Sequence, residues 1–143
     1  MPELHLADST LFYEQRGEGP DLVWLAGGDQ PGSDWHEFQT PAFPDFRNTT
    51  YDARGIGRTT SERRPLWPMA LYGADCAALI EAACDPPVVL AGLSMGSLIA
   101  QQVALDRPEL VPAPCSWGRT PARPGTCASG RKLRSLSGGR EGR

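Results

Sequence analysis

A serine flanked by glycines stands in the second half of the sequence, in the segment Gly92-Leu93-Ser94-Met95-Gly96. This G-x-S-x-G pattern is typical of a sharp strand-to-helix turn that projects the serine Oγ beyond the edge of a sheet. Glycine is needed two residues to either side, because a Cβ there would clash where the chain folds back. A serine held in this way can attack a carbonyl carbon as a nucleophile.

The residues around this serine predict the elements that would position it. Residues 88–91 form a short apolar run rich in β-branched side chains, which is typical of a strand covered on both faces. Residues 95–106 carry apolar side chains at helical spacing, and Pro108 marks the end of the helix. The N-terminus of that helix would offer unpaired N–H groups to a developing oxyanion.

The rest of the chain alternates between predicted strands and helices. Strands are expected at residues 4–6, 11–14, 21–26 and 48–52, a short helix from residue 33 or 34 through Phe38, a surface loop at 59–68 and a helix at 69–84. This order predicts the α/β class, with a mostly parallel sheet covered by helices on both faces.

Three segments resemble the α/β-hydrolase superfamily, in that family's order. They are the strand and loop LVWLAGGDQPGSDW at 22–35, the segment YDARGIGRT at 51–59, and LAGLSMGSLIAQQVALDRPELV at 90–111. The first departs from the family's usual His-Gly, since it has Ala26-Gly27. The resemblance covers the N-terminal half of the fold, is closest to esterase, lactonase and cofactor-free haloperoxidase-like members, and implies an incomplete α/β-hydrolase fold truncated after the helix that follows the serine.

The resemblance implies a serine hydrolase acting on an ester, thioester or lactone carbonyl of a small molecule. Ser94 would be the nucleophile, and the backbone N–H groups of Met95 and Gly28 would form the oxyanion hole. Gly92 and Gly96 would be structural residues of the turn. No cofactor and no metal is implied.

The partners that the nucleophile needs are missing from the predicted order. In this fold the acid and then the histidine follow the serine along the chain. After Ser94 the acidic residues are Asp106, Glu109 and Glu141, and the histidines His5 and His36 both precede it. We therefore expect an impaired hydrolase; the alternatives are a non-catalytic binding protein and a non-functional fragment.

Asp52 and Arg54, in the second of the three segments, could suggest catalysis. A surface ion pair or an anchor for the loop is the preferred interpretation of this pair.

The charge pattern divides the chain at residue 112. Residues 1–111 hold 7 Lys or Arg and 16 Asp or Glu, whereas residues 112–143 hold 7 Lys or Arg and one Glu. We expect residues 1–111 to be the hydrolase-like part, and the Gly-, Pro-, Ser- and Arg-rich residues 112–143 to be a disordered tail. A basic arm for nucleic acid is one interpretation, but aromatic side chains are not interleaved with the basic ones, so nucleic acid is not an expected partner.

A shift of the reading frame near Pro112 is another explanation of the tail. Codons for Pro114 to Gly118 can be read one frame over as Val-Leu-Met-Gly, an apolar run ending in Gly like the family's next strand. Sequencing the coding DNA would test this hypothesis. Without further strands, residues 88–90 would form an exposed sheet edge, which predicts self-association.

Composition limits the remaining classes. A chain of 143 residues is one domain at most, and it has no apolar run of membrane-spanning length. The N-terminus has no basic region followed by an apolar block, so a cytoplasmic location is expected. The four cysteines form no C-x-x-C pair, which argues against a zinc site, and Cys76 and Cys84 are expected to be buried or half-buried thiols.

Overall fold

The computed structural model describes residues 2–62, 66–111 and 115–117. The strands are β1 (Glu3–His5), β2 (Ser9–Arg16), β3 (Asp21–Leu25), β4 (Arg47–Tyr51), β5 (Thr60–Ser61), β6 (Val89–Leu93) and β7 (Cys115–Trp117). The helices are the α-helices α1 (Met69–Ala83) and α2 (Met95–Asp106) and the 3₁₀ helices η1 (Gly32–His36) and η2 (Thr40–Ala42).

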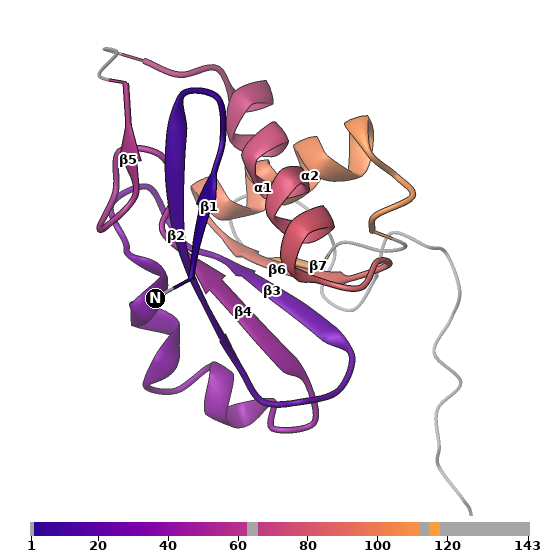
Figure 1. Cartoon of the computed structure of the whole chain (residues 1–143). Helices are drawn as coiled ribbons and strands as arrows, with labels where there is room; N and C mark the ends of the chain where they lie inside the picture. The colour runs from indigo at the N-terminus through magenta and orange to yellow at the C-terminus, as the bar shows by residue number, and fades with distance from the viewer. Residues whose placement is uncertain (1, 63–65, 112–114, 118–143) are drawn as a thin grey trace, which may run out of the picture.

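The strands form one mixed sheet in the order β1-β2-β4-β3-β6-β7, with β5 paired to β2 (Figure 1). The strands β4, β3, β6 and β7 are parallel to one another. The pairs that β2 makes with β1, β4 and β5 are antiparallel. The α/β class is confirmed, but "mostly parallel" describes only the β4–β7 side of the sheet, since β2 turns the other side antiparallel.

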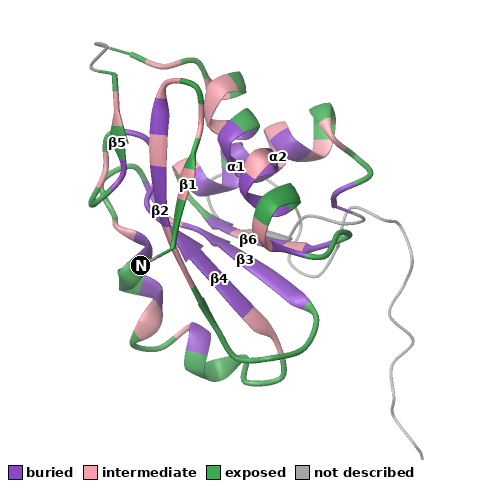
Figure 2. Cartoon of the chain, viewed as in Figure 1, coloured by how far each residue is buried: buried purple, intermediate pink, exposed green. Residues whose placement is uncertain are grey.

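The central strand β3 is buried along its whole length, as Figure 2 shows. Its side chains alternate between two apolar clusters because successive residues of a strand point to opposite faces. Val23 and Leu25 pack with residues of α1 and α2. Leu22 and Trp24 pack with Trp35 of η1 on the other face. Covering both faces explains why this strand reads as a continuous apolar run.

Helices lie on both sides of the sheet, but they differ in kind. The two α-helices pack side by side on one face, while η1 and η2 lie on the other (Figure 1). The helix α1 begins after Pro68 and buries Cys76, Leu79 and Ile80. The short helix expected from residue 33 or 34 through Phe38 is the 3₁₀ helix η1, which ends at His36. Helices of this type rarely run beyond three or four residues.

Three residues of the tail that was expected to be disordered form a strand. Cys115–Trp117 form β7, which pairs with β6 through Ala91↔Cys115 and Leu93↔Trp117. The prediction of an exposed edge at residues 88–90 is also wrong, because Val88 and Leu90 are buried and the Val88 N–H donates to Leu110 O at 2.8 Å. Among the described residues the outer strand on this side is β7. The rest of the predicted tail lies outside the described residues.

Arg54 is buried. The interpretation of Asp52 and Arg54 as a surface ion pair is therefore wrong. Its guanidinium donates from Nε and Nη2 to the two Asp75 carboxylate oxygens at 2.6 and 2.9 Å, and Nη2 also donates to Asp8 Oδ1 at 2.7 Å. The Arg54 side chain is 1% exposed. This residue anchors its loop to α1, which agrees with the second interpretation.

Cys76 and Cys84 are buried free thiols. Burial raises the pKa of Cys76 to about 12 and that of Cys84 to about 11. No helix in the described part of the chain has the length and apolar content that crossing a membrane requires.

Candidate active site

Ser94 occupies the turn between β6 and α2 in a strained backbone conformation. Its φ and ψ are 52° and −117°, and among the described residues it is the one residue other than glycine with a positive φ. Such a conformation costs on the order of 1–3 kcal/mol and persists only where the surroundings impose it. The residue is solvent-exposed at the carboxyl end of β6.

Two glycines let the chain pass close enough to form this turn. A Cβ on Gly92 would lie 2.5 Å from the Gly96 carbonyl carbon and 2.7 Å from the Ser97 nitrogen. A Cβ on Gly96 would lie 2.5 Å from the carbonyl carbon of Leu25 and 2.7 Å from the Ala26 oxygen. Real Cβ atoms do not approach backbone atoms this closely, so the elbow requires glycine on both sides of Ser94.

The first turn of α2 holds the backbone of Ser94 and leaves a donor beside it. The Ser97 N–H and hydroxyl both donate to Ser94 O, at 2.9 and 2.6 Å. Met95 is the first residue of the helix, so its N–H has no acceptor within the helix. A positive helix end with an unpaired N–H favours negative charge beside Ser94.

The loop after β3 runs beside this turn. Leu25 pairs with Gly92, so residues 26–28 follow β3 toward the elbow. The position of a Cβ on Gly28 lies 3.9 Å from Met95 Sδ. The Gly27 N–H is occupied, because it donates to Gln30 Oε1 at 3.2 Å. Gly28 N–H makes no hydrogen bond to any of the described residues.

The acidic residues that follow Ser94 are engaged away from it. Asp106 ends α2, and its Oδ2 accepts a hydrogen bond from Gln102 Nε2 at 2.7 Å. Glu109 accepts from Arg107 Nε at 2.6 Å. Twelve residues of helix separate the elbow from Asp106, a rise of about 18 Å. Neither carboxylate can contact Ser94, and Glu141 lies outside the described residues.

His36 lies on the other side of the sheet from the elbow. Its Nε2 is 2.9 Å from Thr50 Oγ1 on β4, and its Nδ1 is 3.7 Å from Glu14 Oε2 on β2. Thr50 pairs with Trp24, which pairs with Ala91 of β6. Two strand spacings, about 10 Å, and three residues of strand, about another 10 Å, therefore separate Thr50 from Ser94.

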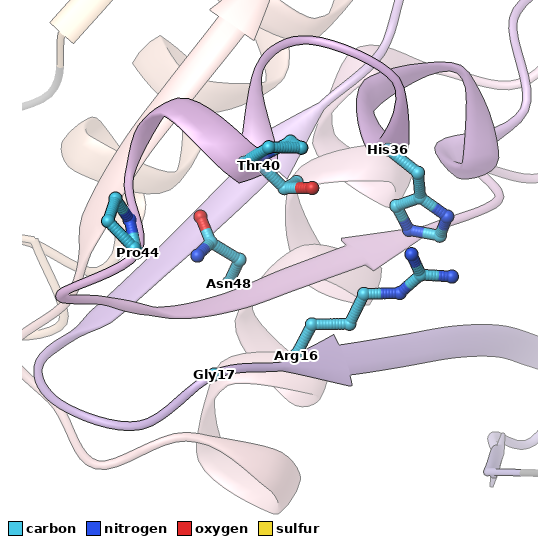
Figure 3. A pocket seen from close by; sticks show the side chains of 7 residues that line it. Arg16, Gly17, His36, Thr40, Pro44 and Asn48 are labelled. Atoms are coloured by element: carbon cyan, nitrogen blue, oxygen red, sulfur yellow. The ribbon is translucent and has the colours of Figure 1, made fainter.

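The surroundings of His36 make a separate, shallow cavity of about 280 Å³ (Figure 3). Its wall includes Arg16, His36, Thr40 and Asn48. Burial lowers the pKa of His36, Arg16 lowers it further and Glu14 offsets part of the decrease. The ring is thus neutral at pH 7, but it lies too far from Ser94 to accept its proton. His5 is more remote still, on the edge strand β1, where Nδ1 bonds Thr10 Oγ1 at 3.0 Å.

The predicted site residues therefore divide into two groups. Ser94, Met95, Gly28, Gly92 and Gly96 meet at the carboxyl edge of the parallel strands, whereas the histidines and later acids lie elsewhere. Among residues 2–62, 66–111 and 115–117, no three His, Cys, Asp or Glu side chains gather in a way that could hold a metal ion.

One polar residue of this edge was not predicted, and a second was predicted without its contacts. Gln30, the first, closes the loop after β3. Asp52, expected to form an ion pair or anchor its loop, accepts the Gly32 N–H at 2.7 Å. Both stand in segments that resemble the family, but their contacts depend on how two loops distant in sequence meet.

Comparison with known proteins identifies the fold and its family. Residues 38–127 match the family model described as serine aminopeptidase, S33. Over 104 residues the chain is 41% identical to BpoC of Mycobacterium tuberculosis, which carries the name of a non-heme bromoperoxidase; the match covers 71% of this chain and 39% of that protein.

Two further relatives are named for reactions at acyl groups. A pimeloyl-[acyl-carrier protein] methyl ester esterase of Aeromonas hydrophila is 30% identical over 100 residues, which is 70% of this chain and 38% of the esterase. The solved structure of Est816, described as an N-acyl homoserine lactone degrading enzyme, superposes with a TM-score of 0.74 at 25% identity, covering 80% of this chain and 44% of that one.

The chain spans about 39% of the length of the curated relatives that it matches first. The family match covers most of this sequence, including the elbow, and extends past Val111 to residue 127. The strand order, the strained Ser94 and the match together lead to one conclusion: this chain belongs to the serine aminopeptidase S33 family of α/β-hydrolases.

Proposed function

We propose that Ser94 is the nucleophile of a hydrolase that acts on an ester, thioester or lactone carbonyl. The observation that carries this proposal is the strained backbone of Ser94 between two glycines that cannot be larger. Backbone strain of roughly 1–3 kcal/mol at an exposed serine is typical of a functional position. The Oγ would attack the carbonyl carbon to form a tetrahedral intermediate.

Met95 and Gly28 are the proposed donors to the oxygen of that intermediate. Met95 begins α2, so its N–H has no acceptor within the helix, and Gly28 lies beside Met95. Gly27 is the less suitable alternative because Gln30 already occupies its N–H. A correctly placed donor of this kind lowers the barrier by roughly 3–4 kcal/mol.

The substrate class rests on the relatives. One is named for a methyl ester and another for an acyl homoserine lactone. In both substrates an acyl carbon is bonded to oxygen. We therefore propose that this chain also acts on a small-molecule ester or lactone. Hydrolysis of such a carbonyl by a serine nucleophile needs no cofactor.

We further propose that the 143-residue chain is impaired in turnover. Attack by Ser94 releases a proton, and among the described residues neither His36, nor Asp106 at the end of α2, nor Glu109 can reach it. Loss of the histidine lowers kcat about a millionfold in a serine hydrolase of another fold. Because the same base serves both the attack of the serine and the later hydrolysis of the acyl-enzyme, both steps should be slow, and a stoichiometric adduct on Ser94 should be easier to detect than turnover.

A fluorophosphonate probe tests this proposal on the full chain. Oγ attack on phosphorus forms a P–O bond and expels fluoride, while the serine proton goes to solvent. Mass spectrometry should find a single adduct on Ser94, no adduct in Ser94→Ala, and the wild-type amount in the control Ser33→Ala, which alters an exposed serine of η1. Folded protein that stays unlabelled would favour the non-catalytic binding function instead.

We also propose that the chain self-associates through β7. The outer strand β7 adjoins β6, and α2 lies against both. Leu93, Leu98 and Leu105 are 39%, 48% and 78% exposed on these elements. The outer edge of β7 has no partner strand among the described residues, and such an edge next to exposed apolar side chains favours pairing with another chain.

Light scattering over a wide range of protein concentration measures this association. The wild type should form dimers or larger species, and the double variant Leu98→Lys, Leu105→Lys should shift toward the monomer. Leu66→Lys is the control, because Leu66 is 86% exposed but lies before α1. A wild type that is monomeric at every concentration would contradict the proposal.

A further inference from the structure

Asp52 is a buried carboxylate directly after β4, at the same edge of the sheet as Ser94. Asp52 as a whole residue is 4% exposed. Oδ1 accepts the Gly32 N–H at 2.7 Å, and Oδ2 accepts the Arg58 N–H at 2.8 Å. The two N–H groups belong to different loops, so one carboxylate ties together residues 27–32 and 53–59.

Gly32 is pressed against the end of β4 at the point where Asp52 holds it. A Cβ on Gly32 would lie 2.8 Å from both the Tyr51 nitrogen and the Tyr51 oxygen. Residues 26–31 therefore span two fixed points, Leu25 in the sheet and Gly32 on Asp52. Within this span, Gln30 folds back on Gly27 through two hydrogen bonds at 3.2 Å.

The second loop holds Asp52 itself in place. Thr59 Oγ1 donates to Asp52 O at 2.6 Å and accepts the Phe12 N–H at 3.0 Å. The Asp52 N–H donates to Phe12 O at 3.0 Å. The carboxylate is thus a fixed reference point, backed by β2, for the loop that carries Gly28.

We propose that Asp52 is a positioning residue that sets the Gly28 N–H relative to Ser94. Asp52 does not touch the reacting atoms; it acts through Gly32 and the loop. The inference rests on the proposed function, because it gives the Gly28 N–H a role at the oxyanion. Displacement of a donor by about 1 Å can cost about a hundredfold in rate, so the anchor of the loop matters to the reaction.

Asp52→Asn is the test variant, since an amide keeps the shape but can accept only one of the two N–H groups through its single oxygen. Asp21→Asn is the matched control. Asp21 is also 4% exposed and accepts bonds from Arg47 and the Asp85 N–H. It begins β3, so it lies at the opposite edge of the sheet from Ser94.

Two measurements are made on each full-length variant at equal folded fraction. In Asp52→Asn, amide hydrogen exchange in residues 27–32 should accelerate about tenfold relative to β3, and phosphonylation of Ser94 should slow about tenfold. In Asp21→Asn, both should stay at the wild-type rate, although the protein is destabilised. A merely structural Asp52 would lower stability without changing the rate at Ser94.

The outcomes separate this inference from the proposed function. Wild-type exchange rates in residues 27–32 of Asp52→Asn would overturn it, as would faster exchange with an unchanged rate at a labelled Ser94. If Ser94 is unlabelled in the wild type, the proposed function fails, and exchange alone decides whether Asp52 positions the loop: acceleration supports it and no change overturns it.

Discussion

Replacing Gly96 by alanine is expected to lower the free energy of unfolding by about 3 kcal/mol or more, enough to prevent a marginally stable chain from folding. The new methyl group would lie 2.5 Å from the Leu25 carbonyl carbon and closer still to its oxygen. Alanine is the better helix former by only about 1 kcal/mol, so the clash outweighs the gain in propensity. Urea denaturation followed by circular dichroism measures the difference.

Gly28→Ala is the control for this prediction. A Cβ at position 28 meets only Met95 Sδ, at an ordinary contact distance of 3.9 Å. Its stability should therefore stay close to that of the wild type. Equal stability of the Gly96 and Gly28 variants would mean that α2 does not approach β3 as closely as the structure shows.

Arg54→Met is expected to cost about 3–5 kcal/mol, because it leaves a buried carboxylate without its counter-ion. Asp75 is 5% exposed at its side chain and takes two hydrogen bonds from Arg54. Methionine keeps the length of the arginine stem, so the loss comes mainly from the charge. Urea denaturation at neutral pH gives the magnitude.

The pH dependence of the Arg54→Met variant provides a second check. Burial raises the pKa of Asp75, and the Arg54 hydrogen bonds offset part of that increase. Without Arg54 the pKa should rise further, so the folded variant binds a proton more tightly than the unfolded chain. Its deficit relative to wild type should therefore shrink as the pH falls.

Arg107→Met is the control for the buried ion pair. Arg107 also contacts two carboxylates, Glu81 and Glu109, but its side chain is 37% exposed. Water and salt screen such pairs, so the denaturation midpoint should hardly move. Equal losses in the two arginine variants would refute the importance of burial for Arg54.

The local patterns of the sequence were enough to predict most elements. The strand at β3, the helices α1 and α2 and the turn at Ser94 follow from runs of neighbouring residues, because periodicity and glycine spacing are local properties. The strands β5 and β7 were not predicted, because β5 lies in the expected surface loop and β7 in the expected disordered tail. Both form by pairing with strands distant in sequence, β2 and β6. Asp52 and Arg54 were interpreted as one pair, but each has its own partner: Asp52 accepts from Gly32, 20 residues earlier, and Arg54 donates to Asp75, 21 residues later.

The sequence by itself determined the family, the elbow and the proposed nucleophile, because one strand, one turn and one helix within 20 residues specify them. Only the tertiary structure decided that His36 lies on the other side of the sheet from Ser94 and that Asp52 anchors the loop after β3. It also decided that the Gly27 N–H is bonded to Gln30, whereas the Gly28 N–H has no partner among the described residues. The physical reason is that strand order and loop contacts bring together residues distant along the chain, and no local pattern encodes which atoms meet there.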